Sequence, residues 1–150
     1  MIEREGKRFN CCESVLMKIN EKHPLKGFGD GVIRAASNMG GGGAGWGSLC
    51  GAVSGSIMAF GLAVGTDGSE SLERFKSIRE EMRACTQEYL GEFEAEWGYV
   101  NCFDLLGVNR RTPEGKVVYE ANKAKGLIHC DDYVQWSVDK ILEIFAELNI

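Results

Sequence analysis

Residues 39–65 read MGGGGAGWGSLCGAVSGSIMAFGLAVG, and this stretch decides the expected fold of the 150-residue chain. The segment 40–47 is almost all glycine and cannot continue as a helix, because glycine carries a large conformational entropy cost there. Apolar residues follow, and they predict a helix over 49–64 that Ser48 caps and Gly65 ends. A glycine-rich loop leading into a central helix is therefore the starting point of the fold.

Small residues recur every four positions along this predicted helix and form one smooth face, made of Gly47, Gly51, Gly55 and Ala59. Such a face lets another backbone approach closely, either within the chain or across a homodimer. The apolar run 49–64 is shorter than the roughly 20 residues that a membrane span requires. We therefore expect a buried helix and no membrane span.

The flanking sequence has the periodicity of amphipathic helices. Asn10 and Glu13 form a capping-box pattern at the start of one of them. The other predicted helices are 30–39, a long one from Ser69 or Ser71 to about Trp97, 101–106, and a last one after Asp131 and Asp132. The segment 108–128 is ambiguous, with a turn signal at 112–115 and a possible short strand at 116–119. The sequence thus predicts an all-α, single-domain bundle of about five helices over 10–150, preceded by a charged tail, 1–9.

Charge and composition exclude several functional classes. The net charge of −5 argues against a nucleic-acid-binding surface, which is normally basic. The N-terminus is charged from residue 3 and shows no secretory signal, so we expect a cytoplasmic location. Six cysteines among 150 residues are too few for a disulfide scaffold. In a reducing compartment such cysteines more often indicate metal or redox chemistry.

Four cysteines fall at the predicted starts of helices, namely Cys12, Cys50, Cys102 and Cys130. A helix N-terminus carries partial positive charge, which favours the thiolate and lowers the pKa of a cysteine. The thiolate is both the nucleophile and the metal ligand, so we expect these four side chains to converge on one site. Cys85 lies on an apolar helical stripe and is expected in the core. Cys11 points about 100° away from Cys12 on the same helix, so the two are not expected to serve one site together. The alternatives for Cys11 are a resolving thiol or a substitute ligand.

The segment CGAVSG at 50–55 resembles the core of a redox-active protein family described by the motif C_GCAxxG_C_C. The resemblance extends over about 10–146: Cys12 matches the first family cysteine, 39–43 the glycine-rich approach, and Cys102 and Cys130 the last two cysteines. A related domain occurs in split-Soret cytochromes c. The resemblance implies redox activity and points to an iron–sulfur cluster. Covalent haem is not expected, because the chain has no Cys-x-x-Cys-His segment.

The residues leave three interpretations of the four thiols open. They would satisfy an iron–sulfur cluster or a zinc ion, and such a centre would serve electron transfer or redox sensing. Backbone amides would then approach the sulfurs at Gly43, Gly47, Gly51 and Gly55. Alternatively, two cysteines exchange between dithiol and disulfide without any cofactor. A non-redox metal- or anion-binding module is the third interpretation. His129, beside Cys130, is either a further ligand or an exposed loop residue.

No catalytic triad, shaped carboxylate pair or nucleotide-binding fold accompanies these thiols. The glycine run at 40–45 fits G-x-G-x-x-G only formally, since no strand precedes it. The sequence therefore predicts an electron carrier or oxidoreductase with no identifiable substrate. The implied partner is another redox protein rather than a nucleic acid.

Overall fold

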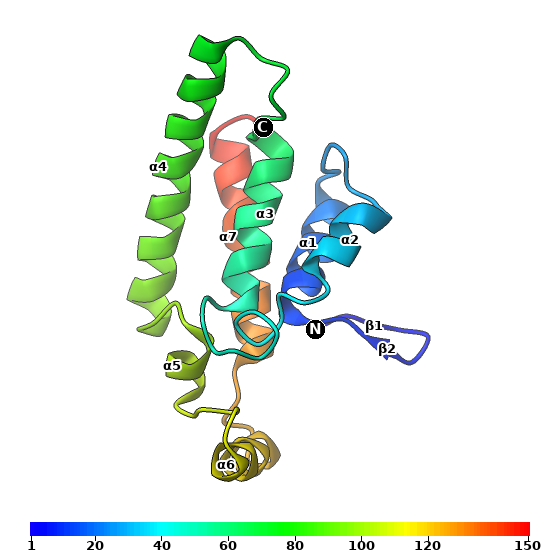
Figure 1. Ribbon diagram of the computed structural model, residues 1–150, viewed down its shortest axis with the longest axis vertical. Coiled ribbons are helices and arrows are strands. Elements are labelled where there is room, and N and C mark those ends of the chain that lie inside the picture. Colours follow the sequence, from blue (N-terminus) through cyan, green and yellow to red (C-terminus); the bar gives the residue numbers. More distant parts are fainter.

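Helix α3, Gly51–Val64, lies at the centre of the computed structural model, which describes residues 1–150 (Figure 1). It packs against α1, Cys11–Lys22, on one side and against α4, Leu72–Trp97, on the other, while α7, Cys130–Glu147, contacts both α1 and α3. The predicted all-α fold with a central helix after a glycine-rich loop is confirmed. There are seven helices instead of about five.

Helix α1 begins as its sequence predicts. The Asn10 side chain accepts a hydrogen bond from the Glu13 backbone N–H at 3.0 Å, and the Glu13 carboxylate accepts one from the Asn10 N–H at 2.7 Å. The Asn10 amide also donates to the carbonyls of Ala36 and Ser37. These bonds hold the end of α2, Asp30–Ala36, against α1. Helix α2 therefore ends at Ala36, whereas the sequence predicted a helix that continues to Met39.

The smooth face of α3 packs inside the chain, against α1. A Cβ placed on Gly55 would lie 2.7 Å from the Cys12 carbonyl oxygen, and one placed on Gly51 would overlap the Cys11 sulfur. The two backbones can approach this closely only because both positions lack a side chain. Gly51 and Gly55 are therefore accounted for by a helix–helix contact within one chain, whereas Gly47 lies before α3 and faces the Phe103 ring.

Three helices meet at a buried hydroxyl cluster on the opposite side of α3. The Tyr89 hydroxyl of α4 forms hydrogen bonds with Ser56 of α3 at 3.0 Å and with Ser137 of α7 at 2.9 Å. Aromatic rings surround it, with Phe60 and Phe145 packed edge to face at 5.7 Å between centroids. Because all three hydroxyls are buried, their mutual hydrogen bonds avoid the cost of unsatisfied polar groups.

The ambiguous segment 108–128 contains helix α6, Pro113–Ala124, and the possible strand at 116–119 was a wrong interpretation. The Thr112 side chain accepts a hydrogen bond from the Gly115 N–H, and proline occupies the first helical position. This combination starts a helix, since proline there loses no intrahelical hydrogen bond. The short helix α5, Cys102–Leu106, precedes it and ends at Gly107 in the left-handed conformation, as expected.

The segment 1–9, expected to be a charged tail, contains a two-stranded hairpin formed by β1, Glu3–Arg4, and β2, Lys7–Arg8. An Arg4–Glu21 ion pair connects the hairpin to α1. None of the helices is both long enough and apolar enough to cross a membrane.

The α1–α3 contact gives a first prediction. Gly55→Ala should destabilise the protein by about 1–3 kcal/mol, because its methyl group would press on the Cys12 carbonyl and on Val15. The matched control is Gly61→Ala in the same helix, where a Cβ meets no atom within 4 Å. That variant should gain about 0.5–1 kcal/mol from better helix propensity. Urea unfolding measures both, and equal stability changes would contradict the close-contact explanation.

Candidate functional site

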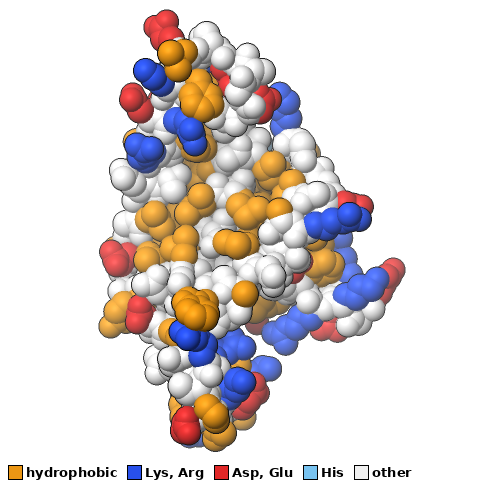
Figure 2. Space-filling view, in the orientation of Figure 1, with side chains coloured by type: hydrophobic (Ala, Val, Ile, Leu, Met, Phe, Trp, Pro, Cys, Tyr) orange, Lys and Arg blue, Asp and Glu red, His pale blue; other side chains and the backbone are white.

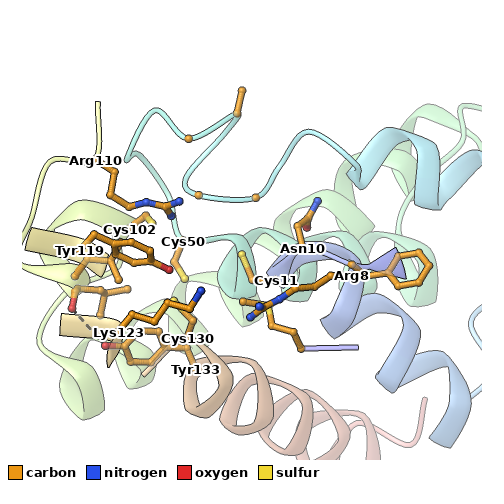
Figure 3. Close-up of a pocket in the computed structure, with 18 of the residues that line it drawn as sticks. Arg8, Asn10, Cys11, Cys50, Cys102, Arg110, Tyr119, Lys123, Cys130 and Tyr133 are labelled. Atoms are coloured by element: carbon orange, nitrogen blue, oxygen red, sulfur yellow. Dashed lines mark hydrogen bonds between the residues drawn. The ribbon is translucent and has the colours of Figure 1, made fainter. Parts of the chain in front are cut away.

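A cavity of about 580 Å³ opens where several helices begin, and four cysteines line it (Figure 3). Cys11 starts α1, Cys102 starts α5, Cys130 starts α7, and Cys50 is the residue immediately before α3. All six cysteines of the chain are free thiols. The fold therefore brings together thiols that are far apart in the sequence.

Cys50 and Cys102 are held side by side by a short antiparallel pairing of two loops. Leu49 and Asn101 form an isolated β-bridge. The Cys50 N–H donates to the Val100 carbonyl at 2.8 Å, and the Cys102 N–H donates to the Ser48 carbonyl at 2.7 Å. This pairing keeps 48–50 extended, so α3 starts at Gly51, later than predicted, and Cys50 rather than Ser48 is its N-cap.

The first cysteine of the cavity is Cys11, whereas the sequence predicted Cys12. Cys12 is fully buried, and its sulfur lies 3.7 Å from the Met58 sulfur, away from the cavity. The reason is helical geometry, since adjacent residues point about 100° apart. The sequence contained a signal for the burial of Cys12. Val15, Leu16 and Ile19 follow it at the spacing of one helical face, and all three are fully buried.

The structure separates the four glycines considered for cofactor binding. Gly51 and Gly55 face α1, and Gly51 makes room for the Cys11 sulfur. Gly43 and Gly47 do not line the cavity, and their N–H groups donate to carbonyls of the same loop. The loop residues that do line the cavity are Gly40, Gly41, Ala44 and Gly45.

Positive charge was the feature that sequence reasoning missed. Arg8, Arg110 and Lys123 line the cavity, and Glu120 is the only carboxylate among the lining residues. Arg110 lies over the Tyr119 ring, 4.1 Å from its centroid. These residues come from separate parts of the chain with an overall negative charge, so no local basic run marked them.

Burial raises the pKa of the cavity thiols, contrary to the expected lowering at helix starts. It raises the pKa of Cys50 and Cys102 to about 12 and that of Cys130 to about 11, and negative charge on neighbouring thiols adds to the rise. The amides of Ala52 and Val53 at the start of α3 lower the pKa of Cys50, but by less than burial raises it. The cavity thiols named here are therefore protonated at neutral pH in the absence of a cation.

Two other candidate residues lie outside the cavity. The exposed His129 ring nitrogen Nδ1 is 2.8 Å from an Asp132 carboxylate oxygen, an arrangement typical of a surface helix start. Cys85 is half-buried on α4, where it packs against the core.

The lining residues on α7 are Cys130 and Tyr133. The Tyr133 hydroxyl donates a hydrogen bond to the Leu105 carbonyl at 3.4 Å.

The spacing of the thiols bears on which metal centre fits them. No three cysteine, histidine or acidic side chains are close enough together to hold a single metal ion. The four cysteines nevertheless line one cavity and provide the Cys₄ donor set of iron–sulfur clusters. In a [4Fe–4S] cluster each thiolate binds a different iron atom, so the sulfurs do not have to approach one another as closely as around one tetrahedral ion.

Comparison with known proteins gives one family. The model of a family described as "Putative redox-active protein (C_GCAxxG_C_C)" matches residues 9–144, which is most of the chain. The sequence-based identification of this family is confirmed. No curated protein and no solved structure shows a match.

The raised thiol pKa values predict an alkaline loss of stability in the metal-free, reduced protein. Unfolding exposes thiols that ionise near pH 9, whereas in the folded state Cys50 and Cys102 stay protonated up to about pH 12. The free energy of unfolding should therefore fall as the pH rises from 9 towards 12. Urea unfolding between pH 8 and 10.5 measures this slope. A Cys50→Ala/Cys102→Ala variant should show a shallower slope, and an unchanged slope would contradict the assignment.

Proposed function

This chain belongs to the C_GCAxxG_C_C family, and we propose that Cys11, Cys50, Cys102 and Cys130 bind an iron–sulfur cluster used in redox chemistry. The observation that carries the proposal is that four thiols from four helix starts line one cavity although no three can hold a single ion. The description of the family as redox-active agrees with such a centre.

The donor set supports a cluster more than a zinc ion. Structural zinc requires four ligand atoms about 2.0–2.3 Å from one centre, and the four thiols lack that convergence. Cys50 and Cys102 are fixed by backbone hydrogen bonds, while Cys11 and Cys130 occupy the first positions of well-packed helices. Rigid placement of this kind suits a centre that must keep its geometry while its charge changes.

The surroundings of the thiols are suited to tuning such a centre. A cluster supplies one-electron transfer, and hydrogen bonds to its sulfurs and its burial set the reduction potential. The amides of Ala52 and Val53 favour the charged form of Cys50. The Arg110 guanidinium does the same for Cys102 and Cys130, although burial has the larger effect on each of these thiols. These groups would compensate the negative charge of four bound thiolates.

The proposal includes a reducing compartment, such as the cytoplasm, and a partner protein that exchanges electrons with the cluster. The part of the surface on which such a partner would dock is the opening of the cavity, because electron transfer requires a short distance to the thiols. Oxidation of two thiols to a disulfide is the competing chemistry, and the experiment below separates the two.

The test is anaerobic reconstitution of the reduced protein with ferrous iron and sulfide. We expect visible absorption between roughly 330 and 460 nm, with stoichiometric iron and acid-labile sulfide, as is typical of Cys-ligated clusters. Single replacement of Cys11, Cys50, Cys102 or Cys130 by serine should lower the bound iron several-fold, because each replacement removes one of four thiolate ligands.

The matched controls are Cys12→Ala and Cys85→Ser, which leave the four cavity thiols intact. Both should load iron as the wild type does, and circular dichroism checks that every variant is folded. The Cys11→Ser and Cys12→Ala pair is the sharpest comparison, since it tests neighbouring residues. A colourless protein that instead forms one specific disulfide between cavity cysteines would overturn the cluster proposal.

A further inference from the structure

We propose that the same cavity also binds a small polyanion, held by Arg8, Arg110 and Lys123 beside the thiols. This site goes beyond the cluster proposal, because it rests on the cations and loop amides of the cavity and not on a bound metal. The ligand class is a small molecule carrying at least two carboxylate or phosphate groups.

The first observation is unpaired positive charge. None of the three cations has a carboxylate partner within 4.0 Å, so a bound anion would not have to replace an existing ion pair. Three cations against one carboxylate give the cavity lining a net positive charge, although the chain as a whole carries a net charge of −5. A concave site lined by one sign of charge attracts ligands of the opposite sign.

The second observation is the placement of these cations. Arg8 comes from the hairpin, while Arg110 precedes α6 and Lys123 lies near its end. Figure 3 shows Arg8 on one side of the thiols and Arg110 on the other. Figure 2 shows Lys and Arg side chains gathered on the lower part of the molecule, between α6 and the hairpin. Cations on two sides of one cavity suit a ligand with two separated anionic groups.

The third observation concerns the glycine-rich loop. Its amides from 43 to 48 all donate to carbonyls within the segment 38–43, which closes that part of the loop on itself. The N–H groups of Gly40 and Gly41 donate to no carbonyl or side chain, and both residues line the cavity. Free amides of this kind are donors suited to carboxylate or phosphate oxygens.

The size of the cavity leaves room for a ligand. Its volume of about 580 Å³ lies within the 300–1,000 Å³ typical of small-molecule sites. Polar side chains are available to such a ligand, since Ser37, Asn38 and Tyr119 are among the lining residues. A polyanion bound there would lie next to the redox-active thiols, as a substrate or effector of that centre would.

The test is calorimetric titration of the reduced, metal-free protein with two probes, pyrophosphate and citrate, at low ionic strength. We expect at least one probe to bind and the affinity to fall on addition of salt. The Arg8→Gln/Arg110→Gln/Lys123→Gln variant should weaken binding at least tenfold. The matched control, Lys26→Gln/Lys116→Gln/Lys125→Gln, removes the same charge outside the cavity and should stay within twofold of the wild type.

Binding of pyrophosphate alone assigns a phosphate ligand, and binding of citrate alone assigns a carboxylate ligand. Binding of neither probe at millimolar concentration, or equal loss of affinity in the two triple variants, would overturn the proposal. A site-specific readout is protection of Cys11, a partly exposed thiol of the cavity, from iodoacetamide by the bound probe, with Cys85 as the internal reference outside the cavity.

The result is distinguishable from the outcome of the cluster test. The Cys50→Ser/Cys102→Ser variant keeps all three cations and should retain the polyanion affinity while losing bound iron. The Arg8→Gln/Lys123→Gln variant keeps all four cavity thiols and Arg110, and it should load iron while losing most of the polyanion affinity. If the cysteine variant also lost polyanion affinity while remaining folded by circular dichroism, the site would depend on the thiols and the proposal would fail.

Discussion

The close approach of α1 to α3 is the contact on which the rest of the structure depends. Gly51 and Gly55 allow the α1 backbone to lie directly against α3. This contact fixes how α1 is rotated about its axis, and the rotation places Cys11 in the cavity and Cys12 in the core. A larger side chain at either glycine would separate the helices and move the first thiol away from the other three.

The remaining thiols are positioned by contacts that converge on the same end of α3. The bridge between Leu49 and Asn101 fixes Cys50 and Cys102 by backbone hydrogen bonds. Helix α7 packs against both α1 and α3, which places Cys130 on the cavity wall. At the far side of α3, the hydrogen bonds of the Tyr89 hydroxyl fix the positions of α4 and α7 relative to α3. The position of every lining thiol thus depends on contacts with α3 or with an element packed beside it.

Much of this arrangement follows from local sequence signals. The capping box at Asn10, the cap at Ser71 and the αL glycine at 107 set helix ends where their sequence patterns predict them. Cys50, Cys102 and Cys130 stand next to such ends, and all three line the cavity. Helix α6 was missed because its turn signal, Thr112 followed by Pro113, is equally a helix start.

Other features depend on tertiary packing and have no local signature. The choice between Cys11 and Cys12 depends on which face of α1 meets α3, and their adjacency in the sequence hides the difference. The pKa values of the thiols depend on burial, which outweighs the effect of the helix start that the sequence suggests. Arg8, Arg110 and Lys123 lie in three separate segments of the sequence and become a group only when the hairpin and α6 border the same cavity.

The distribution of the cavity cysteines along the chain has a consequence for biosynthesis. The first is at residue 11 and the last at residue 130, with the others at 50 and 102. A ribosome delivers these segments in order, from the N-terminus onwards. Three of the thiols therefore emerge before α7 exists, and Cys130 on α7 is the last to be added. Any group that needs all four thiols must be inserted after translation has passed residue 130, so maturation of the site is a late step that follows closure of the fold.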